Sequence, residues 1–221
     1  VVSCLVTLQL TDIPVAFSST QLSVLLSLPV LVVYPLLFAW VSYQTLIRLA
    51  EHKRRLQVMS TRDGMTGVYN RRHWETMLRN EFDNCRRHNR DATLLIIDID
   101  HFKSINDTWG HDVGDQAIVA LTRQLQMTLR GSDVIGRFGG DEFAVIMCGT
   151  SASSAIAAMS RVHERLTQLR LSCAPQVDLR ISVGVAPLTS ETEHYREWLK
   201  SADMALYKAK NSGRNRTEAA A

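Results

Sequence analysis

The chain carries at residues 137–143 the stretch RFGGDEF, which places two glycines and two adjacent carboxylates between apolar segments. Residues 134–138 and 143–147 have the apolar, β-prone composition of strands. A Gly-Gly pair between two such runs predicts a tight hairpin, because glycine adopts the positive φ that primed turns need. The adjacent acids repel each other unless a cation compensates. The stretch is therefore either a solvated turn or a site for a metal ion or another positive group.

Length and composition limit the function classes. The 221 residues leave room for one domain of about 150–160 residues and an extension. A net charge of only +3 gives no field for binding nucleic acid. The four cysteines have no metal-ligand spacing and indicate reduced thiols in a cytosolic domain. Because the chain starts at a valine within an apolar tract, we expect a fragment of a longer protein.

Residues 21–41 contain no charge and are long enough to cross a bilayer as a transmembrane helix. A buried core helix is the alternative, but two prolines make it unfavourable in water. Basic residues follow from position 48, so the positive-inside rule places the rest in the cytoplasm and the protein in the inner membrane. We expect residues 1–10 to end a preceding membrane helix and residues 11–20 to form an outside loop.

The predicted domain organisation follows from this change in composition. Residues 1–44 are membrane segments, residues 45–62 a helical stalk with a weak coiled-coil pattern, residues 63–216 the soluble domain, and residues 217–221 a tail.

Within the soluble domain, apolar periodicity predicts an alternation of helices and strands. Helices are expected at residues 71–88, 116–130, 153–170 and 195–210. Strands are expected at residues 92–99, 134–138, 143–147 and 177–186. A short helical turn at residues 102–107 and a loop at residues 108–114 lie between them, with Asn70 and Asp115 as N-caps. This order predicts an α/β sandwich with a mixed, mostly antiparallel central sheet.

Carboxylates end the otherwise apolar strand at residues 92–99. Burying Asp98 and Asp100 there is costly without a positive partner. One of them, facing Asp141 and Glu142 from a neighbouring strand, would hold a divalent ion that carries a nucleoside triphosphate. The simpler alternative is that Asp98 caps the turn that follows it.

Polar residues beyond this strand suit a nucleotide. Lys103 would face phosphates, and Asn106 with Asp115 would complement a guanine edge. Taken singly, the same residues are ordinary turn and cap formers. Lys210 and Arg214 would reach a terminal phosphate, although a basic last turn followed by glycine is also ordinary helix capping.

Together these residues form an ordered series of motifs that resembles the GGDEF-domain diguanylate cyclases over residues 61–215. The series reads Asp63-x-x-Thr66, Asn70-Arg71-Arg72, Asp98-Ile-Asp-His-Phe-Lys103-x-Ile-Asn106-Asp, Gly110-His111-x-x-Gly114-Asp115, Arg130-x-x-Asp133, Gly-Gly-Asp-Glu-Phe at 139–143, and Ala202-Asp203 with Tyr207-x-Ala-Lys210-x-x-Gly213-Arg214-Asn215. Met65 stands where the family has leucine, a conservative apolar change.

The resemblance implies a nucleotidyl-cyclase-like α/β sandwich with a ferredoxin-like core, and a role for each matching residue. Asp98, Asp141 and the Ile99 carbonyl would bind Mg²⁺, with Mn²⁺ as an alternative ion. Asp141, Lys103 and Glu142 would be catalytic. Residues that would contact GTP are Phe102, Asn106, His111, Asp115, Gly139, Gly140, Lys210 and Arg214. Arg130 and Asp133 match the RxxD inhibitory site that binds the product.

The implied reaction joins two GTP into cyclic di-GMP with release of pyrophosphate. Each subunit would hold one GTP, so a symmetric homodimer is expected. A catalytically silent module that binds GTP or cyclic di-GMP is the alternative, although such modules usually lose one of the acids present here. Another nucleotidyl cyclase, making cyclic GMP or a mixed dinucleotide, is a second alternative.

Overall fold

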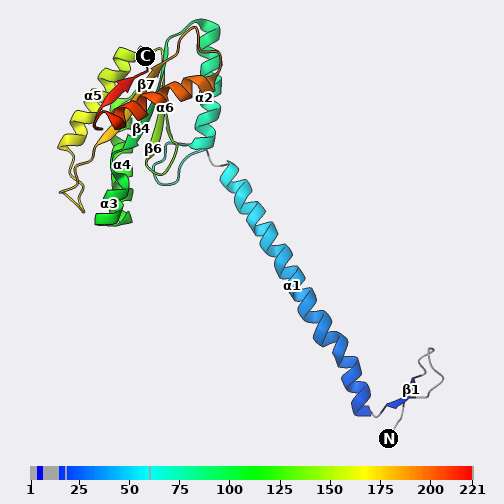
Figure 1. The fold of residues 1–221 in the computed structure, drawn as a ribbon. Helices are drawn as coiled ribbons and strands as arrows, with labels where there is room; N and C mark the ends of the chain where they lie inside the picture. Colours follow the sequence, from blue (N-terminus) through cyan, green and yellow to red (C-terminus); the bar gives the residue numbers. More distant parts are fainter. Residues whose placement is uncertain (1–3, 7–14, 18, 60, 221) are drawn as a thin grey trace. The chain divides into compact units, whose positions relative to one another are not determined.

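A computed structural model describes residues 4–6, 15–17, 19–59 and 61–220, although the side chains of residues 4–6, 15–17, 19, 21, 22, 24–30, 32 and 52–59 lie outside the described set. The chain divides into two compact units, Val1–Met59 and Ser60–Ala221. Figure 1 shows the long helix of the first unit and the sheet and helices of the second.

The N-terminal unit contains one long helix, α1 (Ser19–Met59), which includes residues 21–41 and most of the predicted stalk. Among the described residues, no helix is both long and apolar enough to cross a membrane. Several described apolar side chains of α1, Phe38 and Trp40 among them, are more than half exposed. Part of residues 21–41 lies outside the described side chains, so the predicted membrane span stays a prediction.

The segment before α1 differs from the expected helix end and loop. Cys4–Val6 (β1) pairs antiparallel with Val15–Phe17 (β2). The prediction of helix at residues 4–6 and of loop at residues 15–17 is therefore wrong. The remainder of both predicted segments, residues 1–3, 7–14 and 18, lies outside the described residues.

The second unit is built on a six-stranded sheet of order β3-β5-β6-β4-β7-β8. Its strands are β3 (Tyr69–Asn70), β4 (Ala92–Ile99), β5 (Val134–Arg137), β6 (Glu142–Cys148), β7 (Ile181–Pro187) and β8 (Thr217–Ala219). The three inner pairings, which join β4, β5, β6 and β7, are antiparallel. The outer strands β3 and β8 each pair in parallel with a neighbour. The predicted mixed, mostly antiparallel sheet is confirmed.

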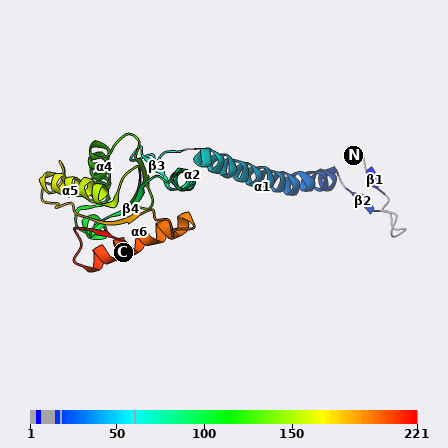
Figure 2. The ribbon, with the colours of Figure 1, turned by 90° about the horizontal axis from the view of Figure 1, so that it is seen from above.

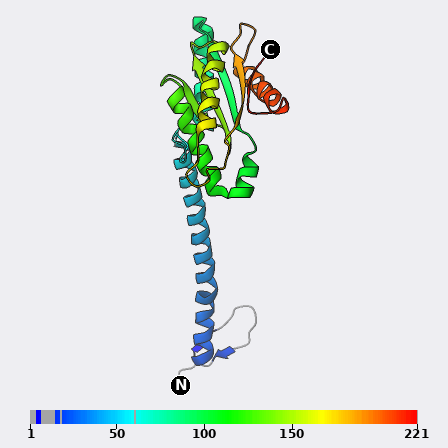
Figure 3. The same cartoon turned by 90° about the vertical axis from the view of Figure 1, so that its left-hand side faces the viewer.

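Helices cover both faces of this sheet, because each face of the central strands is apolar. β4 is buried along its whole length, as a continuous apolar run of a central strand requires. One face packs against α4 (His111–Thr128) and α5 (Ala152–Gln168), and the other against α2 (Arg71–His88) and α6 (Tyr195–Asn211). Figures 2 and 3 show α4 and α5 on one side of the sheet and α6 on the other.

The turn between β5 and β6 differs from the predicted primed hairpin. Four residues, 138–141, connect the strands, and neither Gly139 nor Gly140 has a positive φ. The backbone N–H groups of Phe138 and Gly139 both donate to the carbonyl oxygen of Glu142, at 2.8 and 3.2 Å. A Cβ at position 139 would come within 2.9 Å of the Glu142 carboxylate. The turn therefore requires a left-handed backbone at neither glycine.

Four other elements also need correction. α3 (Phe102–Trp109) is longer than the predicted turn, and α4 begins at His111, so residues 108–114 are mostly helical. Asp115 therefore lies inside α4, and Gly110 occupies the N-cap position predicted for it. Asn70 does cap α2, because its Oδ1 accepts the His73 N–H at 2.9 Å. Residues 177–180 are not strand, and residues 217–219 form β8 in place of a tail.

Candidate active site

The carboxylates predicted from the sequence meet where β4 ends beside the start of β6. Antiparallel pairing places Asp98 directly opposite Glu142. The Ile99 N–H donates to the Asp141 carbonyl oxygen at 3.3 Å, which carries the pairing one step further. Asp98 is buried, whereas Asp141 and Glu142 are half-buried. The two strands therefore bring three acids to one edge of the sheet.

Lys210 supplies the positive charge that this acidic edge needs. Its Nζ lies 2.8 Å from Asp98 Oδ2, an ion pair that joins the last turn of α6 to β4. Burial raises the pKa of Asp98, and Asp141 and Glu142 raise it further, while Lys210 acts in the opposite direction. The net shift is upward, with burial as its largest cause. Asp98 does not cap α3, whose N-cap is His101.

Asp100 has a different environment although it lies only two residues further along the chain. Its Oδ1 accepts the Ser182 hydroxyl at 2.6 Å, and its Oδ2 accepts the Asn215 backbone N–H at 2.8 Å. Asp100 is buried, and both of its oxygens are occupied by these donors. Of the two strand-end acids, Asp98 is therefore the candidate site residue, whereas Asp100 fixes the loop after α6.

The turn at residues 138–141, which carries Asp141, is contacted by the side chain of Arg137. The sequence alone assigned no role to Arg137. Its guanidinium donates to the Gly140 carbonyl oxygen at 2.7 Å and lies 3.2 Å from Asp63 Oδ1. The same Asp63 oxygen accepts the Thr66 hydroxyl at 2.6 Å and the Thr66 backbone N–H at 3.0 Å. Burial acts to raise the pKa of Asp63, but Thr66 and Arg137 outweigh it and lower that pKa. The motif Asp63-x-x-Thr66 thus positions the turn.

Asn106 and Gly114 form a tight contact between α3 and α4. A Cβ at Gly114 would overlap the Asn106 amide and would come within 3.2 Å of the Phe102 ring. Asn106 Oδ1 is buried and has no hydrogen-bond partner within the described part of the chain. Because buried polar atoms are nearly always paired, this amide oxygen is an exception among the described residues.

Four further predicted residues, Lys103, His111, Asp115 and Arg214, lie on the surface. Asp115 borders a cavity of about 450 Å³ between α4 and residues 169–172, and Asn106 is not among the residues that line it. The structure therefore does not place Asn106 and Asp115 in one cavity. Arg214 has a left-handed backbone, and its N–H donates to the Ala209 carbonyl oxygen at 3.0 Å, so its backbone closes α6.

Arg130 and Asp133 lie between α4 and β5, away from the acidic edge. Asp133 is buried, and its Oδ2 accepts the Arg130 backbone N–H at 2.8 Å. Its Oδ1 is buried without a partner among the described residues, and burial raises its pKa. Both residues line a cavity of about 210 Å³ together with Arg62 and Tyr69.

The donor set at the acidic edge fits a hard divalent cation. Asp98 and Asp141 offer carboxylate oxygens, and Ile99 directly follows Asp98 and donates its N–H to the Asp141 carbonyl oxygen. Oxygen ligands of this kind, few in number and without histidine or cysteine, suit Mg²⁺ or Mn²⁺ shared with a phosphate.

A family model described as "Diguanylate cyclase, GGDEF domain" matches residues 60–216, which include every residue of this site. The chain belongs to the GGDEF-domain family. Among curated GGDEF relatives, it is 82% identical over 221 residues to "Probable diguanylate cyclase DgcC" of Escherichia coli, covering 100% of this chain and 60% of that protein. It is 34% identical over 157 residues to "Diguanylate cyclase DosC" of the same organism, covering 71% of this chain and 34% of that protein.

Solved GGDEF structures have the same fold. The GGDEF domain of DgcB from Caulobacter crescentus, in complex with c-di-GMP, aligns with a TM-score of 0.69 at 30% identity, covering 73% of this chain and 96% of that one. The coiled coil and GGDEF domain of the same protein align with a TM-score of 0.70 at 29% identity, covering 83% of this chain and 99% of that one. The chain spans about 60% of the length of the DgcC proteins it matches.

Proposed function

We propose that this chain is the catalytic part of a diguanylate cyclase, which joins two GTP into cyclic di-GMP and releases two pyrophosphates. The observation that carries the proposal is the meeting of Asp98, Asp141 and Glu142 at one sheet edge beside Lys210. Family membership and 82% identity to a probable diguanylate cyclase support it. A silent nucleotide-binding module would not need all three acids in place.

Asp98, Asp141 and the Ile99 carbonyl would hold Mg²⁺, which, when bound, stabilises the charge on the attacking and leaving oxygens of an in-line displacement. Asp141 would accept the proton of the 3′-hydroxyl as that oxygen attacks the α-phosphorus of the other GTP. Lys103 and Lys210 would neutralise the triphosphate, and Lys210 would leave its ion pair with Asp98 to do so. Glu142 completes the acidic set.

Asn106 is the residue that we assign to guanine. Its buried Oδ1 lacks a partner in the described chain, and a guanine N–H group would satisfy it. Phe102 and Gly114 pack around this amide and limit its movement. Asp115, His111 and Arg214 would contact the base and phosphates from the surface, and Gly139 and Gly140 would let the nucleotide approach the turn.

The product is a symmetric ring, so each of two chains would contribute one bound GTP in a C2 arrangement. Product binding at Arg130 and Asp133 would inhibit the enzyme, and the unpaired Asp133 oxygen in a cavity supports a ligand there. We further propose that residues 21–41 anchor the protein in the inner membrane with this domain in the cytoplasm, which rests on their uncharged sequence and the basic residues that follow.

The deciding experiment incubates the purified chain with GTP and Mg²⁺ and identifies the product by mass. Cyclic di-GMP is the expected product, and the rate should rise steeply with protein concentration because two chains must meet. Cyclic GMP would point to another nucleotidyl cyclase, and bound but unreacted GTP would point to a silent module. Either result would overturn the proposal.

A further inference from the structure

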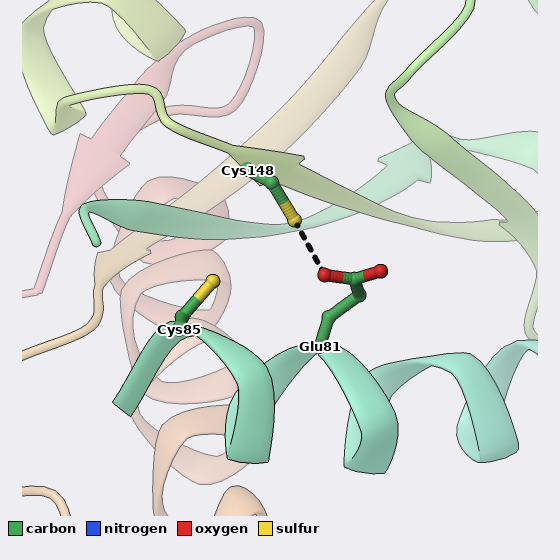
Figure 4. A group of neighbouring side chains, drawn as sticks. All are labelled: Glu81, Cys85 and Cys148. Carbon is green, nitrogen blue, oxygen red and sulfur yellow. Dashed lines mark hydrogen bonds between the residues drawn. The ribbon is translucent and has the colours of Figure 1, made fainter. Parts of the chain in front are cut away.

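A second group of metal-binding side chains lies on the α2 face of the sheet, apart from the acidic edge. Glu81 and Cys85 are four positions apart on α2, so they share one face of that helix, and Cys148 ends β6. One ligand atom from each of the three lies within 4.8 Å of the others. Figure 4 shows Cys148 and Glu81 pointing toward each other, with the Cys85 thiol on the same side of α2.

The local chemistry is unusual for an apolar core contact. Cys85 is 2% exposed, whereas Cys148 and Glu81 are half-buried, and the Cys148 thiol donates to the Glu81 carboxylate at 3.3 Å. Burial raises the pKa of both thiols, and the Glu81 charge raises each further. Without a cation the two thiols therefore stay protonated and are poor nucleophiles, which argues against a redox-active pair.

We propose that Glu81, Cys85 and Cys148 bind one zinc-like divalent ion and so join α2 to β6. Two thiolates and a carboxylate are a ligand set that Zn²⁺ accepts, with its fourth position left for water. Zinc–sulfur bonds of about 2.3 Å in a tetrahedral site place two sulfurs about 3.8 Å apart, so small side-chain movements suffice from the present separation. Binding would release both thiol protons.

Charge balance agrees with this assignment. Two thiolates, one carboxylate and a divalent ion leave a net charge of about −1 at the site. The positive charge of Arg90 acts on the Cys85 thiol and lowers its pKa, so it also lies where it would offset that residual charge. The proposed site uses none of the residues assigned to GTP, and its test is independent of the activity.

The test uses the full chain, reduced with a phosphine, stripped with a chelator and kept in excess Mg²⁺ to saturate the carboxylate site. Cd²⁺ is the probe, because a cadmium–thiolate bond gives charge-transfer absorption in the ultraviolet. We expect one Cd²⁺ per chain with this band, release of two protons, and a weaker band when excess Zn²⁺ competes for the site. Zn²⁺ should also raise the melting temperature, because it binds the folded state.

Variants assign the band to these residues. C85S or C148S should remove at least half of the absorption, and E81Q, which keeps both thiols, should weaken Cd²⁺ binding by about tenfold or more while retaining the band. C173S makes the same change at an exposed thiol outside the cluster, and it should alter neither the absorption band nor the affinity for Cd²⁺.

The proposal fails if the reduced wild-type chain shows no band with Cd²⁺. A disulfide between Cys85 and Cys148 in an air-oxidised sample would not rescue it. The proposal also fails if the band survives in both C85S and C148S. If either serine variant misfolds, E81Q decides the test, because its side chain is only half-buried. Circular dichroism checks that E81Q is folded.

Discussion

Lys210 and Asp98 are joined across the sheet edge by an ion pair of 2.8 Å, although 112 positions separate them in the sequence (210 − 98). The pair couples the last turn of α6 to the end of the central strand. Because Asp98 is buried and Lys210 is only about one-third exposed, the contact is sheltered from solvent. This sheltered pair lies where the proposed reaction needs both a metal ligand and a phosphate partner.

Replacing Asp98 or Asp141 with alanine should lower cyclic di-GMP synthesis by on the order of 100-fold or more, because each change removes charge stabilisation of the transition state. Product formation from GTP and Mg²⁺ is measured by chromatography, and folding by thermal melting. Asp178→Ala, which removes an acid from an exposed ion pair with Arg180, is the matched control and should stay active. Full activity in both site variants would refute the metal assignment.

Asn106→Ala should raise the KM for GTP by about tenfold, since the buried amide would no longer pair with guanine. The kcat should fall less than the affinity does. Initial rates over a range of GTP concentrations separate the two constants. Asn84→Ala makes the same change on α2, on the far side of the sheet from α3, and should leave KM unaltered; an equal effect from it would count against the guanine assignment.

Arg137→Ala should lower kcat by about 10- to 100-fold with little change in GTP binding, because the turn that carries Asp141 loses its hold on the Gly140 carbonyl. Arg137→Lys, which cannot bridge Gly140 and Asp63 with a planar fork, should rescue it only in part. Arg180→Ala removes a guanidinium from an exposed pair and serves as control. Unchanged kcat in Arg137→Ala would show that the turn holds its position without this contact.

Arg130→Ala should relieve inhibition by cyclic di-GMP, because the cavity beside Asp133 loses one of the two arginines that line it. Initial rates with added product, together with calorimetry of product binding, measure the effect. Arg165→Ala, on the exposed face of α5, should leave inhibition as in the wild type. Inhibition that persists in Arg130→Ala would place the product site elsewhere.

His163 should make the domain less stable in mild acid. Burial lowers the pKa of His163, and Asn215 and Asp100 oppose that shift only in part. Below the ordinary histidine pKa of about 6.5 the unfolded chain therefore binds more protons than the folded one, so stability falls as pH decreases. Urea unfolding at pH 7.5 and 5.5 should show a smaller loss for His163→Gln than for the wild type. Equal losses in the two proteins would contradict the prediction.

The sequence predicted α2, β4 and the two strands β5 and β6, because their apolar runs and the Asn70 cap are local signals. It also predicted that a strand-end Asp would face Asp141 and Glu142 from a neighbouring strand, because these acids are unfavourable without a shared cation, and the pairing of β4 with β6 does bring them together. The Arg137–Asp63 contact depends on folding across 74 positions, which no local pattern encodes. The separate uses of Asp98 and Asp100 likewise depend on Ser182 and Asn215, which reach Asp100 only in the folded sheet.

The parallel pairing of β8 with β7 has a practical consequence for choosing where to end a shortened protein. The matched family region stops at residue 216, and a chain cut there would keep every motif yet lose Thr217–Ala219. The backbone of β7 from Val183 to Val185 would then lie open along the sheet, next to the strand that bears Asp98. Exposed strand edges recruit other chains. We therefore expect a chain that ends at residue 216 to aggregate more readily than one that keeps β8.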